Sequence, residues 1–462
     1  MKHMRDSHFP KNFIWGAAAS SYQIEGAAYD DGKGPSVWDQ FCKKEGTIHN
    51  GDNGDSACDH YHRFKEDIHL MDQLNIPAYR LSISWPRVLP EGIGSVNQKG
   101  LDFYDRLVDS LLEKKITPHV TLFHWDFPQA LMDKGGWLQE ESPVWFEEYT
   151  RIIADRLSDR VSHWMTLNEP FCHVMLGHKT GYHAPGLKLP DRDILKILHN
   201  IYLAHGRSVL ALRSCAKINP QIGIAMVGSP AIPHTEDPGD IEAARQAMFC
   251  LKGDGGDLWN MGLWFDPLLL GRYPEGYEEI FAPILPDISP DDMKIICQPL
   301  DFLGLNIYQS GRVRMGKEGP EAVPNFLIKG MPKSNMGWPV TPEGLYWGPR
   351  FFYERYKTPI YITENGLANQ DWVFLDGKVH DPQRIDFLTR YLLQLNRALQ
   401  EGIDVRAFMH WSLLDNFEWA YGYDKRFGII HVDFQTQKRI IKDSGYWYST
   451  LIGTNGRSLF TP

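Results

Sequence analysis

The chain has 462 residues, a net charge of −10, and a composition that is 43% hydrophobic and 23% charged. This composition is ordinary for a globular protein, and the length allows a large core without disulfide or metal staples. The acidic balance argues against nucleic-acid binding, which requires a basic face.

The sequence lacks the usual signals of export, membrane insertion and metal binding. Neither a signal peptide nor a run of 18 apolar residues is present, so no membrane partner is expected. The six cysteines are scattered without a CxxC pair, which indicates free thiols and predicts a cytoplasmic location. The acidic stretch 51–60 lacks the spacing of a calcium loop, and we expect neither a metal site nor a cofactor.

Eight apolar segments, rich in β-branched and aromatic residues, predict strands. In chain order they are 13–20, 78–83, 119–125, 162–169, 222–227, 301–308, 360–364 and 405–411. Amphipathic segments between them predict helices, the clearest being 59–74, 97–115 and 381–402. Asp59 is the expected N-cap of the first, and the last begins with Pro382 and closes on Gly402.

The alternation of strands and helices predicts a parallel sheet, and eight is the number of strands that closes a (β/α)8 barrel. A doubly wound sheet would carry a glycine-rich phosphate turn after its first strand, and none is present. We expect one catalytic domain over 1–462, with about 1–8 as a short N-terminal extension. Four long segments should extend the loops at the C-terminal face, where barrels place their active sites: 24–58, 170–192, 228–258 and 309–345.

Polar and aromatic residues gather at the C-terminal ends of the predicted strands. In chain order they are Gln23, Arg80, His124, Trp125, Asn168, Glu169, Asn306, Tyr308, Glu364 and Trp411. Strands 4 and 7 of such a barrel are expected on opposite sides of the ring, which would bring Glu169 and Glu364 face to face across its mouth. Two facing carboxyl groups beside aromatic rings are typical of glycoside hydrolysis.

The neighbours of the two glutamates predict different roles for them. Arg80 is expected beside Glu364, where its charge would lower the pKa of the carboxyl group and keep it ionised as a nucleophile. Glu169 has no cation in its local sequence and faces a second carboxylate, so a raised pKa and an acid/base role are expected. In a retaining mechanism the two carboxyl groups lie about 5–5.5 Å apart.

Seven segments resemble the signatures of glycoside hydrolase family 1, the retaining β-glucosidases and their relatives. They are "FIWGAAASSYQIEG", "YRLSISWPRVLP", "TLFHWDFPQAL", "TLNEP", "LNIY", "YITENG" and "HWSLLDNFEW…RFGIIHVDF". The resemblance runs in family order from about Phe9 to the C-terminus.

The resemblance implies a role for each matching residue. Glu169 would be the acid/base and Glu364 the nucleophile, with a hydrogen bond from Tyr308. The implied sugar-binding and supporting set is Gln23, His124, Trp125, Asn168, Asn306, Trp411, Glu418, Trp419 and Phe427. Trp338 would line the aglycone side, with Cys172 and His183 as neighbours.

What the resemblance implies is an exo-acting retaining β-glucosidase without a cofactor. Its partners would be small β-glucosides or oligosaccharides, with β-galactosidase or β-fucosidase side activity and transglycosylation. A 6-phospho-β-glycosidase is one alternative, because Lys425 matches half of the phosphate-binding pattern. Glu418 argues against it, since an unpaired carboxylate repels a phosphate dianion. A non-catalytic sugar-binding protein is the other alternative, and the sequence does not indicate an oligomeric state.

Overall fold

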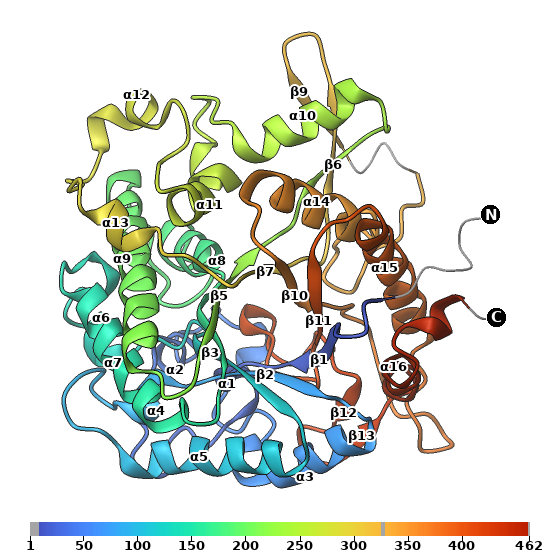
Figure 1. Cartoon of the computed structure of the whole chain (residues 1–462). Coiled ribbons are helices and arrows are strands. Elements are labelled where there is room, and N and C mark those ends of the chain that lie inside the picture. The colour runs from blue at the N-terminus through green and yellow to red at the C-terminus, as the bar shows by residue number, and fades with distance from the viewer. Residues whose placement is uncertain (1–8, 325–328, 461–462) are drawn as a thin grey trace.

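The computed structural model describes residues 9–324 and 329–460, so the extension predicted for 1–8 lies outside the described residues. Eight parallel strands form a closed barrel at the centre of the molecule (Figure 1). Around the ring they are β1 (Ile14–Ala18), β2 (Ala78–Ser82), β3 (Thr117–Phe123), β4 (His163–Asn168), β5 (Gln221–Val227), β7 (Phe302–Asn306), β10 (Ile360–Asn365) and β11 (Val405–Trp411).

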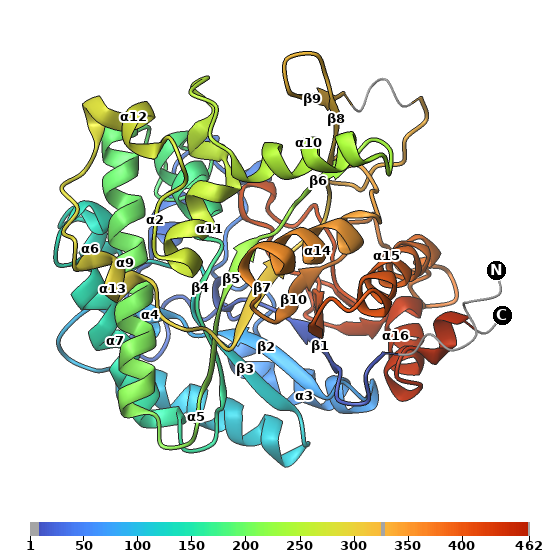
Figure 2. The ribbon, with the colours of Figure 1, turned by 45° about the horizontal axis from the view of Figure 1, so that its top comes forward.

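Helices follow the strands and surround the barrel, as the two views together show (Figure 2). The longer ones are α3 (His60–Gln73), α5 (Gln98–Glu113), α7 (Ser142–Leu157), α9 (Asp191–Cys215), α10 (Pro238–Phe249), α11 (Met261–Leu270), α14 (Gly344–Tyr356), α15 (Pro382–Gln400) and α16 (Asp443–Gly453). The shorter ones are α1 (Ser21–Ile24), α2 (Val37–Phe41), α4 (Trp85–Val88), α6 (Gln129–Met132), α8 (Pro170–Val174), α12 (Tyr277–Phe281) and α13 (Asp292–Ile296). Single turns are η1 (His49–Gly51), η2 (Gly136–Leu138), η3 (Met175–Lys179), η4 (Asp257–Trp259), η5 (Ala282–Ile284), η7 (Trp419–Tyr421) and η8 (Arg457–Phe460).

This architecture confirms the predicted (β/α)8 barrel, and each of the eight predicted strands coincides with a barrel strand. The three predicted helices are α3, α5 and α15, and Pro382 is the first residue of α15. The expected cap of α3 is wrong in its chemistry. Asp59 occupies the N-cap position, but its φ is +51° and its side chain caps no backbone N–H. Its carboxylate instead accepts hydrogen bonds from His62 and Arg63.

The long segments after the strands contain secondary structure of their own. The segment 228–258 holds α10 and β6 (Ala231–Pro233), which forms a three-stranded sheet with β8 (Gly311–Met315) and β9 (Pro320–Val323). The β8–β9 hairpin projects from the barrel at the top of Figure 1. A second small sheet consists of the antiparallel strands β12 (Ile430–Val432) and β13 (Arg439–Ile441).

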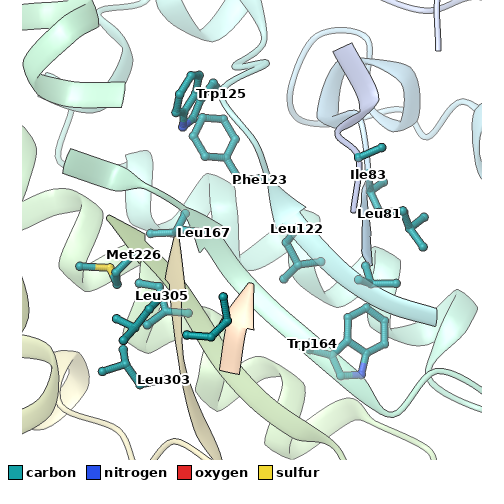
Figure 3. Packing of buried hydrophobic residues seen from close by; sticks show 14 of the residues in the cluster. Leu81, Ile83, Leu122, Phe123, Trp125, Trp164, Leu167, Met226, Leu303 and Leu305 are labelled. Carbon is teal, nitrogen blue, oxygen red and sulfur yellow. The ribbon is translucent and has the colours of Figure 1, made fainter. Parts of the chain in front are cut away.

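The main core lies between the strands and the surrounding helices. Buried side chains from several strands, such as Leu81 of β2, Leu122 of β3 and Leu305 of β7, belong to this layer (Figure 3). Because successive residues of a strand point to opposite faces, Arg80 faces away from this layer while its neighbours Tyr79 and Leu81 belong to it. The strand pattern thus aims Arg80 into the barrel interior, toward the residues described below.

Three other findings bear on the sequence predictions. Within 9–324 and 329–460, no helix is long and apolar enough to cross a bilayer. In the same residues no group of three or more histidine, cysteine or acidic side chains could hold a metal ion. All six cysteines belong to the described part and are free thiols.

Candidate active site

The two ends of the barrel interior differ in chemistry. An apolar cluster inside the barrel contains Met165, Ala225, Phe302, Tyr361 and Ala407, all but Ala225 from the first half of their strands. The rings of Phe302 and Tyr361 stack there with centroids 4.1 Å apart. Toward the C-terminal ends, buried polar side chains, among them Arg80, Asn168 and Glu364, lie beside aromatic rings, so the candidate site lies at the face that the fold makes available for chemistry.

Glu364, the second-last residue of β10, accepts hydrogen bonds from two donors, one on β2 and one on the segment that follows β7. Arg80 Nη1 donates to its Oε1 at 2.5 Å, and the hydroxyl group of Tyr308 donates to its Oε2 at 2.6 Å. Arg80 also donates to Thr121 Oγ1 and Thr363 O, so the guanidinium itself is fixed in place. Both carboxylate oxygens of Glu364 are therefore oriented by charged or polar groups that cannot easily move.

Glu169 directly follows β4 and immediately precedes α8. Its φ of +42° is in the left-handed region, which is uncommon for a residue other than glycine. Asn306 Nδ2 donates to its Oε1 at 2.8 Å and to Asn168 Oδ1 at 3.0 Å. The Cys172 thiol also hydrogen-bonds to this carboxyl group.

The ring positions of the two glutamates correct one expectation. Only β5 and β7 separate β4 from β10 on one side, so the two strands are three steps apart and not diametrically opposite. Asn306, from β7 between them, hydrogen-bonds to Glu169 and also interacts with Glu364. The two carboxyl groups are close enough that the charge of Glu364 raises the pKa of Glu169.

Electrostatics distinguish the two carboxyl groups, although not entirely as the sequence predicted. Burial and then the charge of Glu364 raise the pKa of Glu169 to about 7. Burial also raises the pKa of Glu364, against the lowering effects of Arg80 and Tyr308. The prediction that Arg80 lowers the pKa of Glu364 overall is therefore wrong, because burial of the carboxylate raises the pKa by more than the guanidinium lowers it. Glu364 nevertheless has the stabilising cation, which Glu169 lacks.

A third buried carboxyl group belongs to Glu418, on the loop after β11. Gln23 Nε2 donates to its Oε2 at 3.3 Å, and also to Phe417 O at 2.9 Å and Asn416 Oδ1 at 3.1 Å. Burial and then the charge of Glu364 raise the pKa of Glu418 to about 8. The sequence analysis did not predict this raised pKa.

Aromatic rings form the walls around these carboxyl groups. The ring of His124 stacks on those of Trp411 and Trp419, with centroids 5.8 and 6.0 Å away. Trp125 lies against Trp419 at 4.6 Å, and its Nε1 donates to Asn168 O at 2.9 Å. His124 Nε2 and Asn168 Nδ2 are 3.1 Å apart, which joins this wall to the polar network.

These side chains enclose a cavity of about 240 Å³. Predicted site residues that line it are His124, Trp125, Asn168, Glu169, Cys172, His183, Tyr308, Trp338, Glu364, Trp411, Glu418, Trp419 and Phe427. Gln23, Arg80 and Asn306 are outside the lining and contact it through hydrogen bonds to Glu418, Glu364 and Glu169.

Four lining residues were missed by the sequence analysis: Leu176, Tyr182, Met336 and Tyr421. Tyr182 precedes His183, and Tyr421 comes three residues after Glu418, so adjacency to predicted residues was the available signal. The ring of Tyr182 stacks on His183 at 5.3 Å and meets the ring of Tyr421 edge-on at 6.2 Å.

The geometry can be compared with known proteins. The model of glycosyl hydrolase family 1 matches residues 5–457, nearly the whole chain. The chain belongs to glycosyl hydrolase family 1. As a family 1 member, the protein is a glycoside hydrolase, and the resemblance seen in its seven sequence segments is confirmed.

Family 1 relatives match along almost their full lengths. β-Glucosidase A of Thermotoga maritima is 48% identical over 457 residues, covering 98% of this chain and 99% of the relative. A solved structure of the β-glucosidase from Thermotoga maritima, in complex with glucoimidazole, has a TM-score of 0.89 at 46% identity and covers 97% and 100% of the two chains. An aryl-phospho-β-D-glucosidase of Bacillus subtilis is 38% identical, covering 99% and 100%. Membership in family 1 therefore does not decide between plain and phosphorylated glucosides as substrates, and the residues of the site must be compared for each.

Proposed function

We propose that the protein is an exo-acting retaining β-glucosidase. The observation that carries the proposal is the pairing of Glu169 and Glu364 in one cavity with different partners. Glu364 accepts from a guanidinium, which suits a carboxylate nucleophile, whereas the pKa of Glu169 is raised to about 7, which suits a proton donor. The β-glucosidase relatives at 48% identity support the same reaction.

In the first step, Glu364 attacks the anomeric carbon while Glu169 gives its proton to the glycosidic oxygen, which leaves with the aglycone. A covalent glycosyl-enzyme results, with an ester bond between C1 and Glu364. In the second step, Glu169 takes a proton from water, the water oxygen bonds to C1, and Glu364 is released as a carboxylate. An alcohol in place of water would give transglycosylation. Retention requires the carboxyl groups to lie about 5–5.5 Å apart.

Sugar recognition would use the buried polar groups around the two glutamates. Glu418, which accepts a hydrogen bond from Gln23, would bind the O4 and O6 hydroxyl groups together with Gln23, and Trp411 and Trp419, which line the cavity, would contact the sugar ring. Galactose differs from glucose only in the orientation of its C4 hydroxyl group, and fucose is galactose without the C6 hydroxyl group, so β-galactosidase and β-fucosidase side activities are part of the proposal.

The cavity favours a plain glucoside over a 6-phosphoglucoside. Among the described residues that line it, none is a lysine or arginine. Arg80 is behind the lining and already bonded to Glu364 and Asn168. Lys425 is half-buried and lies 5.3 Å from the ring centroid of Tyr421, without itself lining the cavity. A phosphate dianion would therefore enter a site with three carboxyl groups and no available cation.

The aglycone side is mainly apolar. Leu176, Met336, Trp338 and the ring faces of Tyr182 and Tyr421 offer contact area but few hydrogen-bonding groups. Aryl and alkyl β-glucosides, together with cellobiose and short oligosaccharides, are the substrates proposed. The proposal also includes a single catalytic domain over 1–462 and a cytoplasmic location. The six free thiols support that location.

One panel of kcat/KM values tests the proposal. It compares 4-nitrophenyl β-glucoside, β-galactoside, β-fucoside and 6-phospho-β-glucoside with cellobiose. We expect the plain glucoside to exceed the phosphorylated one by at least 100-fold, and Glu364→Ala to abolish turnover. Preference for the phosphorylated sugar would make the protein a 6-phospho-β-glycosidase. Binding of glucosides without hydrolysis by pure wild type would make it a non-catalytic binding protein.

A further inference from the structure

Behind the cavity lies a buried chain of six charged side chains that alternate in sign. In order of contact they are Asp381, Arg384, Asp371, Lys442, Asp415 and Arg426. The first five side chains are at most 1% exposed, and Arg426 is 21% exposed. The chain has three positive and three negative members, so it is neutral as a whole, and none of its members lines the cavity.

The stability of the fold does not by itself account for this chain of charges. Burying an ion costs several kcal/mol, and replacing a buried ion pair by apolar groups of similar size is often neutral or stabilising. What a buried ion network can supply is a defined geometry, because each charge must stay within hydrogen-bonding distance of its partners. The functional question is which segments the network holds together.

One segment follows the proposed nucleophile. Arg384, on α15, donates from Nη2 to Leu367 O at 3.2 Å, and Leu367 is the third residue after Glu364. The same Nη2 donates to Arg426 O at 2.8 Å and to Asp371 Oδ2 at 2.7 Å. A single guanidinium therefore ties the loop after β10 to the residue that precedes Phe427, which lines the cavity.

The other segment carries Glu418. Asp415, three residues before Glu418, accepts from Gly428 N at 3.0 Å and from Arg426 Nη1 at 2.7 Å. Its carboxylate thus closes residues 415–428 into a loop that presents Glu418 and Phe427 to the cavity. Lys442 Nζ joins this loop to Asp371 by contacting Asp415 Oδ1 at 2.7 Å and Asp371 Oδ2 at 2.5 Å.

We propose that Arg384, Asp415 and Lys442 are positioning residues. They hold the loop of residues 415–428, and with it Glu418, at a fixed position relative to Glu364. The inference rests on the proposed function, since it assigns Glu418 to the O4 and O6 hydroxyl groups of the sugar. If the network is broken, Glu418 moves relative to Glu364 and therefore relative to the C1 atom of the bound sugar. Substrates that have the C6 hydroxymethyl group then lose more binding than substrates without it.

The experiment replaces Lys442 by Met, which removes the charged amino group and keeps an unbranched side chain only one atom shorter. We measure KM and kcat for 4-nitrophenyl β-glucoside and for the β-xyloside, which lacks the C6 hydroxymethyl group. The expected result is a rise of the glucoside KM by roughly 10- to 100-fold, the range for lost hydrogen bonds to charged groups, with a smaller change in kcat. The xyloside keeps the O4 hydroxyl group but lacks O6, so its KM should also rise, by a smaller factor, and the preference for glucoside over xyloside falls.

A second buried ion group provides the matched control. Arg439 donates to Asp67 Oδ1 at 2.9 Å, and His60 Nδ1 is 2.7 Å from Asp67 Oδ2, with all three side chains at most 2% exposed. These residues join α3 to β13 and do not line the cavity. Arg439→Met should lower the melting temperature but leave the glucoside-to-xyloside preference at the wild-type value.

Arg426→Gln, at the more exposed end of the network, keeps the test decisive if Lys442→Met does not fold. It should shift the preference in the same direction. An unchanged preference in a folded Lys442→Met or Arg426→Gln protein, or an equal shift in Arg439→Met, would overturn the positioning role. Wild type that hydrolyses neither glycoside would instead refute the proposed function.

Discussion

At the scale of single residues, the site depends on a difference in environment between two chemically identical side chains. Both glutamates are buried, and burial raises both pKa values. Arg80 and Tyr308 bond to Glu364, whereas Glu169 has an amide and a thiol as partners. Because only one of the two has a cation, the proton shared by such a pair resides on Glu169.

The pH dependence of the reaction follows from this assignment. A proton donor must be protonated, so kcat/KM should fall as the pH rises through the pKa of Glu169, about 7. Glu169→Gln should remove this fall and lower kcat/KM for an alkyl glucoside by roughly 10²- to 10⁴-fold, the usual contribution of general acid catalysis. The kcat/KM of the variant for a dinitrophenyl glucoside, whose leaving group needs no proton, should fall far less, because kcat/KM reports the first step only.

The control for this profile is Glu318→Gln, which alters an exposed carboxyl group on the β8–β9 hairpin. Its pH profile should match that of wild type. If Glu169→Gln retains the fall above pH 7, the titrating group is not Glu169, and Glu418, with its pKa of about 8, becomes the group to examine.

At the scale of elements, the site depends on how closely β10 and β11 approach at their C-terminal ends. Gly366, two residues after Glu364, lies so near β11 that a Cβ atom there would be 1.8 Å from Trp411 O. That carbonyl belongs to the backbone and cannot rotate away. Gly366 therefore allows β10, which has the proposed nucleophile Glu364, to pack closely against β11, which has Trp411.

Gly366→Ala should push these two strand ends apart. We expect a loss of stability of about 1–3 kcal/mol, as for other overpacked cores, and a fall in kcat of up to roughly 10²-fold from misplacing Glu364. Gly311→Ala on β8 is the control, because its Cβ would meet nothing within 4 Å. Thermal unfolding and kcat measurements on both variants test this, and wild-type values for Gly366→Ala would refute the close-approach argument.

At the scale of the whole molecule, the features readable from the sequence are those with a regular period or a contiguous motif. The eight strands have runs of apolar residues, and Glu169 and Glu364 stand directly at strand ends. The six-membered charge network has no such signal, since Asp371 and Lys442 are separated by 71 residues and meet only in the fold. Likewise, the position of Arg80 beside Glu364 was predictable from the strand pattern. The pKa of Glu364 was not, because it also depends on how completely the barrel excludes water from the carboxyl group.

The three buried carboxyl groups of the cavity also affect folding. The unfolded chain ionises Glu418 near its usual pKa of 4.5, whereas the folded protein holds its pKa at about 8. Folding stability is therefore lost as the pH rises from about 4.5 to about 8, because the unfolded state releases the proton first. Glu418→Gln should be more stable than wild type at pH 8, by up to roughly 4 kcal/mol, and gain little at pH 4.5.

Urea denaturation at the two pH values, with Glu318→Gln as the exposed control, measures this gain. An equal difference at both pH values would show that folding does not raise the pKa of the Glu418 carboxyl group. If the gain grows with pH, the residues assigned to sugar binding are a source of instability in the empty enzyme. The folded state is then a compromise in which the same buried carboxyl groups serve the substrate and oppose the fold.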